Sequence, residues 1–112
     1  MVITRGDTIP CMFQRKNKEG QPIEDKAPKI YFTVKESNEE EEVVLQKTID
    51  DMEFDENFIY HFTIWPEDTD NLYYGTYKYD IQVKYPEVNY KKTISKGNFI
   101  IEDESTWKAN EV

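Results

Sequence analysis

The chain of 112 residues is long enough for one domain with one core, and its 38% hydrophobic and 14% aromatic residues exclude a disordered chain. Its 23 acidic and 14 basic residues give a formal net charge of −9, so we expect neither nucleic acid nor an anionic membrane as a partner. A single cysteine, Cys11, excludes an intramolecular disulfide, and no apolar run approaches the roughly 20 residues of a membrane span.

Apolar and polar residues alternate along most of the chain with a period of two. Ile30, Phe32 and Val34, for example, alternate with more polar neighbours. Successive side chains of a strand point to opposite faces, so each such segment has one apolar face, as in antiparallel sheets that cover a core. Connections rich in Gly, Pro, Asn and Asp separate the segments. The pattern predicts about seven strands, at residues 2–5, 8–14, 29–36, 43–48, 57–64, 76–85 and 90–102.

Seven short strands at regular spacing are typical of an all-β, immunoglobulin-like antiparallel β-sandwich. We place this domain at residues 1–103 and a polar C-terminal tail at 104–112. Pro10 lacks an N–H, so its strand is expected at a sheet edge. Around Gly97 the apolar residues change from even-numbered positions, as at Ile94, to odd-numbered positions, as at Phe99. This change predicts a β-bulge or a short break. Tyr77 fits the tyrosine corner of such domains, in which the hydroxyl bonds to nearby backbone.

Residue types that support catalysis or metal binding form no recognisable motif. His61, the single histidine, lies on the polar face of its strand, and nothing places it beside Cys11, which we expect to pack as a small apolar residue. No Cys-x-x-Cys pair is present for a transition metal. The acidic loops 50–56 and 67–70 lack the spacing of an EF-hand and leave calcium open. We therefore expect no catalytic, cofactor-binding or metal-binding residues, and no enzymatic activity.

Six aromatic residues fall off the main apolar faces, namely Tyr31, Trp65, Tyr73, Tyr74, Tyr90 and Trp107. We take Trp65, Tyr73, Tyr74 and Trp107 as the candidate interface. Exposed aromatic side chains mark protein interfaces or platforms for sugars. They also form rims that close the ends of a sandwich, and the sequence does not decide between a rim and an interface.

Six short segments stand out along the chain: ITRGDT at 3–8, KIYFTVKE at 29–36, QKTI at 46–49, IWPEDT at 64–69, GTYKYDIQ at 75–82 and KGNF at 96–99. Their order and spacing resemble those of small immunoglobulin-like proteins of tailed phages and prophages of Gram-positive bacteria. They are also similar to the N-terminal domain of phage baseplate upper proteins. The resemblance covers roughly residues 3–103.

The resemblance implies a non-enzymatic structural or assembly subunit of a virion tail, baseplate or neck. Such a subunit is made in the cytoplasm of the bacterial host and resides in the virion. Its expected partners are other virion proteins and further copies of the chain. The aromatic surplus supports an alternative, a carbohydrate-binding or surface-adhesive module. The part of the virion, the binding surface and the oligomeric state stay open.

Overall fold

The computed structural model describes residues 1–36 and 42–103. Its elements are β1 (Val2–Thr4), β2 (Ile9–Gln14), β3 (Lys29–Lys35), β4 (Val43–Thr48), the 3-10 turn η1 (Ile49–Asp51), β5 (Glu53–Phe54), β6 (Ile59–Ile64), α1 (Pro66–Thr69), β7 (Gly75–Tyr85), the 3-10 turn η2 (Pro86–Val88) and β8 (Tyr90–Glu102). All seven predicted strands are present, with ends that differ by at most two residues from those expected. Neither α1 nor any other helix in these ranges is long and apolar enough to cross a membrane.

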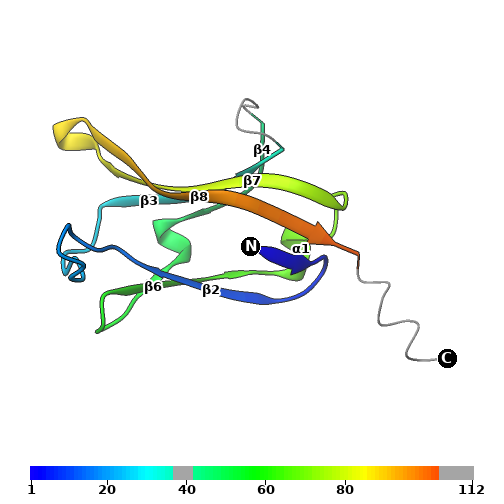
Figure 1. Ribbon diagram of the computed structural model, residues 1–112, viewed down its shortest axis with the longest axis horizontal. Coiled ribbons are helices and arrows are strands. Elements are labelled where there is room, and N and C mark those ends of the chain that lie inside the picture. The colour runs from blue at the N-terminus through cyan, green and yellow to red at the C-terminus, as the bar shows by residue number, and fades with distance from the viewer. Residues whose placement is uncertain (37–41, 104–112) are drawn as a thin grey trace.

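Two sheets face each other across the core (Figure 1). One has the strand order β1-β8-β7-β3-β4 and the other the order β2-β6-β5. The orders β2-β6-β5 and β8-β7-β3 correspond to strands B-E-D and G-F-C of an immunoglobulin domain. The predicted all-β, immunoglobulin-like sandwich is therefore confirmed. One strand departs from the antiparallel arrangement that we expected: β1 runs parallel to β8, with Val2 opposite Ile100.

The core consists of the inward rows that the alternation predicts. The Phe32 ring of β3 lies 4.9 Å from Phe62 in the opposite sheet and 6.3 Å from Phe99 in its own sheet. Burying each large side chain of this kind contributes roughly 1.5–3 kcal/mol. The largest fully buried side chains are Tyr60, Phe32, Phe99, Ile30, Ile64, Ile101, Val34 and Val83, together with Thr69. Side chains from both sheets therefore fill the space between them.

The acidic connection at 50–56, expected to be irregular, contains two ordered elements. The turn η1 opens it, and the Asp51 carboxylate accepts a hydrogen bond from the Thr48 backbone N–H at 2.8 Å. The two-residue strand β5 follows and pairs with β6. Met52 is buried between these elements. A two-residue strand is too short for any alternation to appear in the sequence, so the pattern could not predict it.

The strand that contains Pro10 lies at a sheet edge, as predicted. Within the described chain, β2 pairs with β6 and with no other strand. An edge strand has one side on which no ladder hydrogen bond is required, and a residue without an N–H is tolerated there. This edge position also leaves one long side of the three-stranded sheet uncovered by a neighbouring strand.

The predicted β-bulge is present in β8, but it lies at Ile94 instead of Gly97. The β7–β8 register shifts so that Ser95 and Thr93 oppose consecutive residues of β7, which leaves Ile94 as the extra residue. Gly97 has another role, since a Cβ there would lie 3.1 Å from Cε1 of Tyr79. The glycine therefore makes room for the Tyr79 ring, and the parity change has its origin three residues earlier.

Candidate functional site: an aromatic surface at the α1 end

His61 and Cys11 lie on opposite faces of the three-stranded sheet. Cys11 is paired with the buried Phe62 and lines the interior side, whereas His61 is paired with Met12, which is exposed. Burial raises the pKa of the Cys11 thiol, against the opposing effect of the Lys47 charge, so the thiol stays protonated at neutral pH. The two side chains therefore do not form a nucleophile–base pair.

His61 contacts Asp55 instead, in the hairpin between β5 and β6. Its Nε2 lies 2.7 Å from Asp55 Oδ2. The other carboxylate oxygen accepts hydrogen bonds from the backbone N–H groups of Asn57 at 2.8 Å and Ile59 at 3.0 Å. The His61 contact and then the Ile59 N–H hold the pKa of Asp55 below its usual range. All of these contacts close the hairpin turn, and no group of three or more potential metal ligands occurs in residues 1–36 and 42–103.

Three of the four candidate interface residues gather at one end of the sandwich. Because β6 ends at Ile64 and β7 begins at Gly75, the connection between them, with α1 inside it, lies wholly at this end (Figure 1). It carries Trp65, Tyr73 and Tyr74, with exposed fractions of 49%, 84% and 44%. We call these three residues the α1 surface. Trp107 lies outside the described residues.

The other two off-core aromatic residues lie elsewhere. Tyr31 is on the outer face of β3, where Lys84 Nζ lies 4.9 Å from its ring centroid. Tyr90 begins β8 at the opposite end of the molecule, and its ring is 5.8 Å from that of Tyr85. The aromatic surplus is therefore divided among several places, and the α1 surface is its most exposed group.

A nearly buried ion pair fixes the backbone at Trp65. The Asp68 carboxylate accepts a hydrogen bond from the Trp65 N–H at 2.7 Å, and the same oxygen lies 2.7 Å from Nζ of Lys47. The Lys47 side chain points inward from β4 and is 11% exposed. The fully buried Thr69 adds a further link, since its hydroxyl oxygen accepts the Gly6 N–H at 2.9 Å. Helix α1 is thereby tied to β4 and to the connection between β1 and β2.

A tyrosine corner fixes the backbone at Tyr73, as the sequence predicted for Tyr77. The Tyr77 hydroxyl donates to the Tyr73 carbonyl at 2.8 Å. Burial, and then the charge of Glu36, raise the pKa of Tyr77, so the hydroxyl stays protonated and keeps its donor role. Beside it, the Arg5 guanidinium lies 4.4 Å from the centroid of the Tyr74 ring. The α1 surface thus presents aromatic rings on a constrained backbone.

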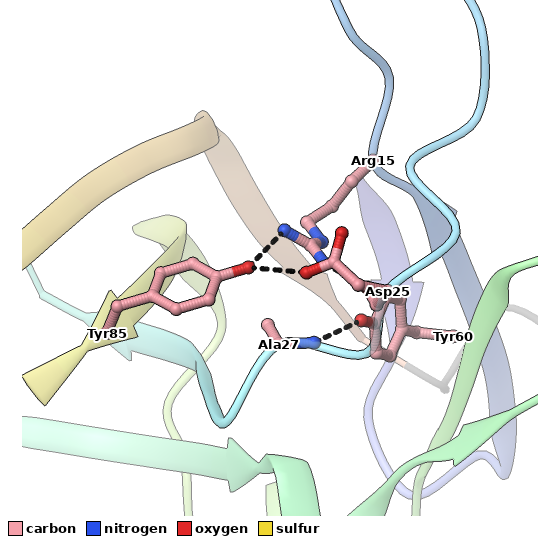
Figure 2. Close-up of polar contacts among 5 residues, drawn as sticks. All are labelled: Arg15, Asp25, Ala27, Tyr60 and Tyr85. Atoms are coloured by element: carbon pink, nitrogen blue, oxygen red, sulfur yellow. Dashed lines mark hydrogen bonds and ion pairs between the residues drawn. The ribbon is translucent and has the colours of Figure 1, made fainter. Parts of the chain in front are cut away.

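At the opposite end of the sandwich, the hydroxyls of Tyr60 and Tyr85 bond to neighbouring elements (Figure 2). The Tyr60 hydroxyl oxygen accepts the Ala27 N–H at 3.1 Å. The Tyr85 hydroxyl accepts a hydrogen bond from Arg15 at 3.0 Å and donates to Asp25 at 3.2 Å. Arg15 is 7% exposed and also donates to the Asp25 carbonyl. These contacts close the end of the sandwich and join β2, β7 and the connection that precedes β3.

Lys47 and Arg15 hold the two ends of the sandwich together, and the alternation pattern did not single them out. For Lys47 a signal existed, since it has the same parity as the buried Leu45 and therefore faces inward on β4. Arg15 follows the last residue of β2, where alternation no longer applies. Its partners come from residues 10 and 70 positions away in the chain, so no local pattern could indicate them.

No family model matches the chain, and no curated protein or solved structure matches it significantly. The fold is therefore established by its strand order and its core. An immunoglobulin-like sandwich supports many unrelated functions, so a function has to be inferred from the surfaces that the sandwich carries.

Proposed function

We propose that the chain is a non-enzymatic structural or assembly subunit of a tailed-phage or prophage virion. It acts through protein–protein contacts at the α1 surface. The observation that carries the proposal is Tyr73, whose ring is 84% exposed while its carbonyl is fixed by the Tyr77 hydroxyl at 2.8 Å. A sandwich that used this residue only to close its own end would bury the ring.

Constrained, exposed aromatic residues are suited to binding a protein partner. Tyrosine and tryptophan dominate the energetics of protein interfaces. Binding also costs free energy when loops and side chains have to be ordered. At the α1 surface much of that ordering is already present, because Asp68 fixes Trp65 and Tyr77 fixes Tyr73. A partner that covers these rings gains contact area at low entropic cost.

The virion assignment comes from the six segments whose order and spacing resemble phage immunoglobulin-like proteins. One of the six contains a residue of the surface, since IWPEDT includes Trp65, and GTYKYDIQ contains Tyr77, whose hydroxyl bonds the Tyr73 carbonyl. The expected partners are other virion proteins or further copies of the chain in the tail, baseplate or neck. The net charge of −9 keeps unassembled subunits apart in solution.

The test is incorporation into particles. Phage particles are purified from induced host cultures that express the tagged chain, and the chain is quantified by mass spectrometry. We expect it to copurify with particles, and the double variant Trp65→Ala/Tyr73→Ala to reduce incorporation at least about tenfold, the factor that corresponds to about 1.4 kcal/mol of binding free energy. Far-ultraviolet circular dichroism checks that the variant stays folded.

Val88→Ala is the matched control, because Val88 is 73% exposed in η2 and lies away from the α1 surface. It should incorporate normally. Particles that lack the wild-type chain altogether would contradict the virion role. Titration against purified wall polysaccharides separates the alternative function: binding that Trp65→Ala abolishes would favour a carbohydrate-binding module.

A further inference from the structure

A second surface lies along the free part of the β8 edge. Strand β1 covers β8 only from Ile100 to Glu102. From Tyr90 to Lys96, β8 is paired with β7 on one side, and the described chain supplies no strand on the other side. At the covered part, the Asn98 carbonyl accepts the terminal ammonium of Met1 at 3.0 Å and the Ile100 N–H donates to the Met1 carbonyl at 2.9 Å. The peptide groups of these even-numbered residues therefore point away from β7.

The same alternation extends to Lys96, whose peptide group also points toward the uncovered side. Toward the start of β8, the bulge at Ile94 moves the alternation by one residue. The peptide groups that point outward there are those of Thr93 and Lys91. The free edge thus presents backbone donors and acceptors over about 23 Å, at roughly 3.3 Å per residue. This length matches a partner strand of about seven residues.

An apolar groove lies beside this edge, between β8 and the edge strand β2 of the opposite sheet. Its volume is about 800 Å³. Core residues of both sheets form its floor, among them Phe32, Phe62 and Ile81. Met12 on β2, with 69% of its surface exposed, and Tyr90 on β8 stand on its rim. A strand that paired with β8 would place every second side chain over this groove.

The groove is cationic in an otherwise acidic protein. The described residues that line it include Arg15, Lys16 and Lys92, and none of them is Asp or Glu. Lys92 is opposite the buried Val83 and therefore lies on the groove side of β8. The Arg15 guanidinium lies 3.8 Å from the Asp25 carboxylate, a side chain that is 68% exposed. An acidic ligand fits this distribution of charge.

We propose that the edge of β8 from Tyr90 to Lys96 accepts an extended acidic segment of a partner protein as an added strand. Apolar side chains on the groove-facing side of that segment fill the groove, and carboxylates on the same side face Lys92 and Lys16. A second copy of the chain fits less well. Pairing two β8 edges would bring Lys91, Lys92 and Lys96 of one copy near those of the other, and opposed like charges destabilise such a pair.

This inference rests on the proposed role as a binding module, but it concerns a surface separate from Trp65 and Tyr73. It is tested with a fluorescent ten-residue peptide that has Thr at every second position and, in turn, Val and Glu at the positions between, so that one face of the added strand carries both apolar and acidic side chains. Fluorescence anisotropy measures binding to the full chain, and amide hydrogen exchange locates the contact. We expect saturable binding, with slower exchange at the outward amides of Lys96 and Thr93.

Lys92→Glu should weaken binding at least tenfold, while Lys35→Glu, which makes the same charge change on β3, should leave it within twofold. Lys96→Pro removes an outward backbone N–H and should also weaken binding. If Lys96→Pro does not fold, Lys92→Glu still tests the proposal. Trp65→Ala/Tyr73→Ala should bind the peptide normally, so failure at either surface can be recognised separately.

Three results would overturn the inference. The first is the absence of binding up to about 1 mM peptide, the range of the weakest specific contacts. The second is equal binding of a peptide with Lys in place of Glu. The third is a dimer, seen by light scattering, that protects the β8 edge before any peptide is added.

Discussion

The two ends of the sandwich use the same residue types in opposite ways. At the end shown in Figure 2, the Tyr60 hydroxyl bonds the Ala27 N–H, and the Tyr85 hydroxyl bonds Arg15 and Asp25. At the α1 end, the Tyr77 hydroxyl fixes the backbone of Tyr73 and leaves the Tyr73 ring in solvent. Buried polar contacts stabilise both ends, but at the α1 end they hold aromatic rings outward. The difference separates an end at which tyrosine hydroxyls join elements of the core from an end at which aromatic rings are exposed to solvent.

The largest expected contrast is between one tyrosine from each end. Tyr60 is fully buried and stacks on Phe13 at 4.9 Å, so Tyr60→Ala should lower the free energy of unfolding by about 3–5 kcal/mol. Tyr73→Ala should change it by less than about 0.5 kcal/mol, because the ring is exposed. Urea denaturation followed by circular dichroism measures both. Similar losses in the free energy of unfolding for the two variants would contradict the difference between the two ends.

The next effect concerns the anchor of Trp65. Asp68→Ala removes the acceptor of the Trp65 N–H and leaves Lys47 without its partner, so we expect a loss of about 2–3 kcal/mol. Trp65 fluorescence should also become more accessible to acrylamide.

Asp70→Ala is the control for this change, since Asp70 is an exposed residue at the end of α1. It should alter stability by less than about 0.5 kcal/mol. Lys47→Met/Asp68→Asn should recover part of the loss, because it removes both charges together. No recovery would show that the ion pair is not what holds α1.

A smaller effect is expected at the tyrosine corner. Tyr77→Phe keeps the ring and removes one hydrogen bond, which corresponds to about 0.5–1.5 kcal/mol. Amide exchange in the connection before β7 should become faster. Tyr31→Phe, on the outer face of β3, should change neither quantity. Unchanged exchange in Tyr77→Phe would mean that the corner does not constrain Tyr73.

The smallest effect concerns pH and lies in the hairpin between β5 and β6. The pKa of Asp55 is lowered by His61 and by the Ile59 N–H, so the unfolded chain takes up a proton at higher pH than the folded one. Its stabilising contribution is therefore complete above the ordinary pKa near 3.8 and is lost as the pH falls through the lower pKa of the folded protein. Acid titration of Asp55→Asn should lack this component. If Asp55→Asn lost stability at acidic pH just as the wild type does, Asp55 would not be the source of this loss.

The sequence predicts most of the fold, because two-residue alternation is a local signal. The rows of β3 and β7 follow from it directly, and the edge position of β2 follows from the missing N–H of Pro10. The exact place of the bulge does not follow, since Ile94 and Gly97 lie within the same change of parity and only the pairing with β7 distinguishes them. The corner at Tyr77 was predictable because its partner is only four residues away.

The candidate site was predicted only in part. The sequence named Trp65, Tyr73 and Tyr74, but it could not distinguish a closing rim from an interface. That decision depends on tertiary contacts: the hydroxyls of Tyr60 and Tyr85 have buried partners, whereas the Tyr73 ring is left in solvent. The groove beside β8 was not predicted at all, because it arises from the unequal lengths of β1 and β8 and from their pairing.

Hydroxyl-radical footprinting of the chain, free and within purified particles, tests most directly whether the α1 end is a contact surface. The rings of Trp65, Tyr73 and Tyr74 are exposed in the free protein and should be oxidised readily there. In particles we expect their oxidation to fall several-fold, while that of Tyr31, on the outer face of β3, serves as a reference on another face. Equal oxidation of the three rings in both states would show that the α1 surface is not where the protein binds.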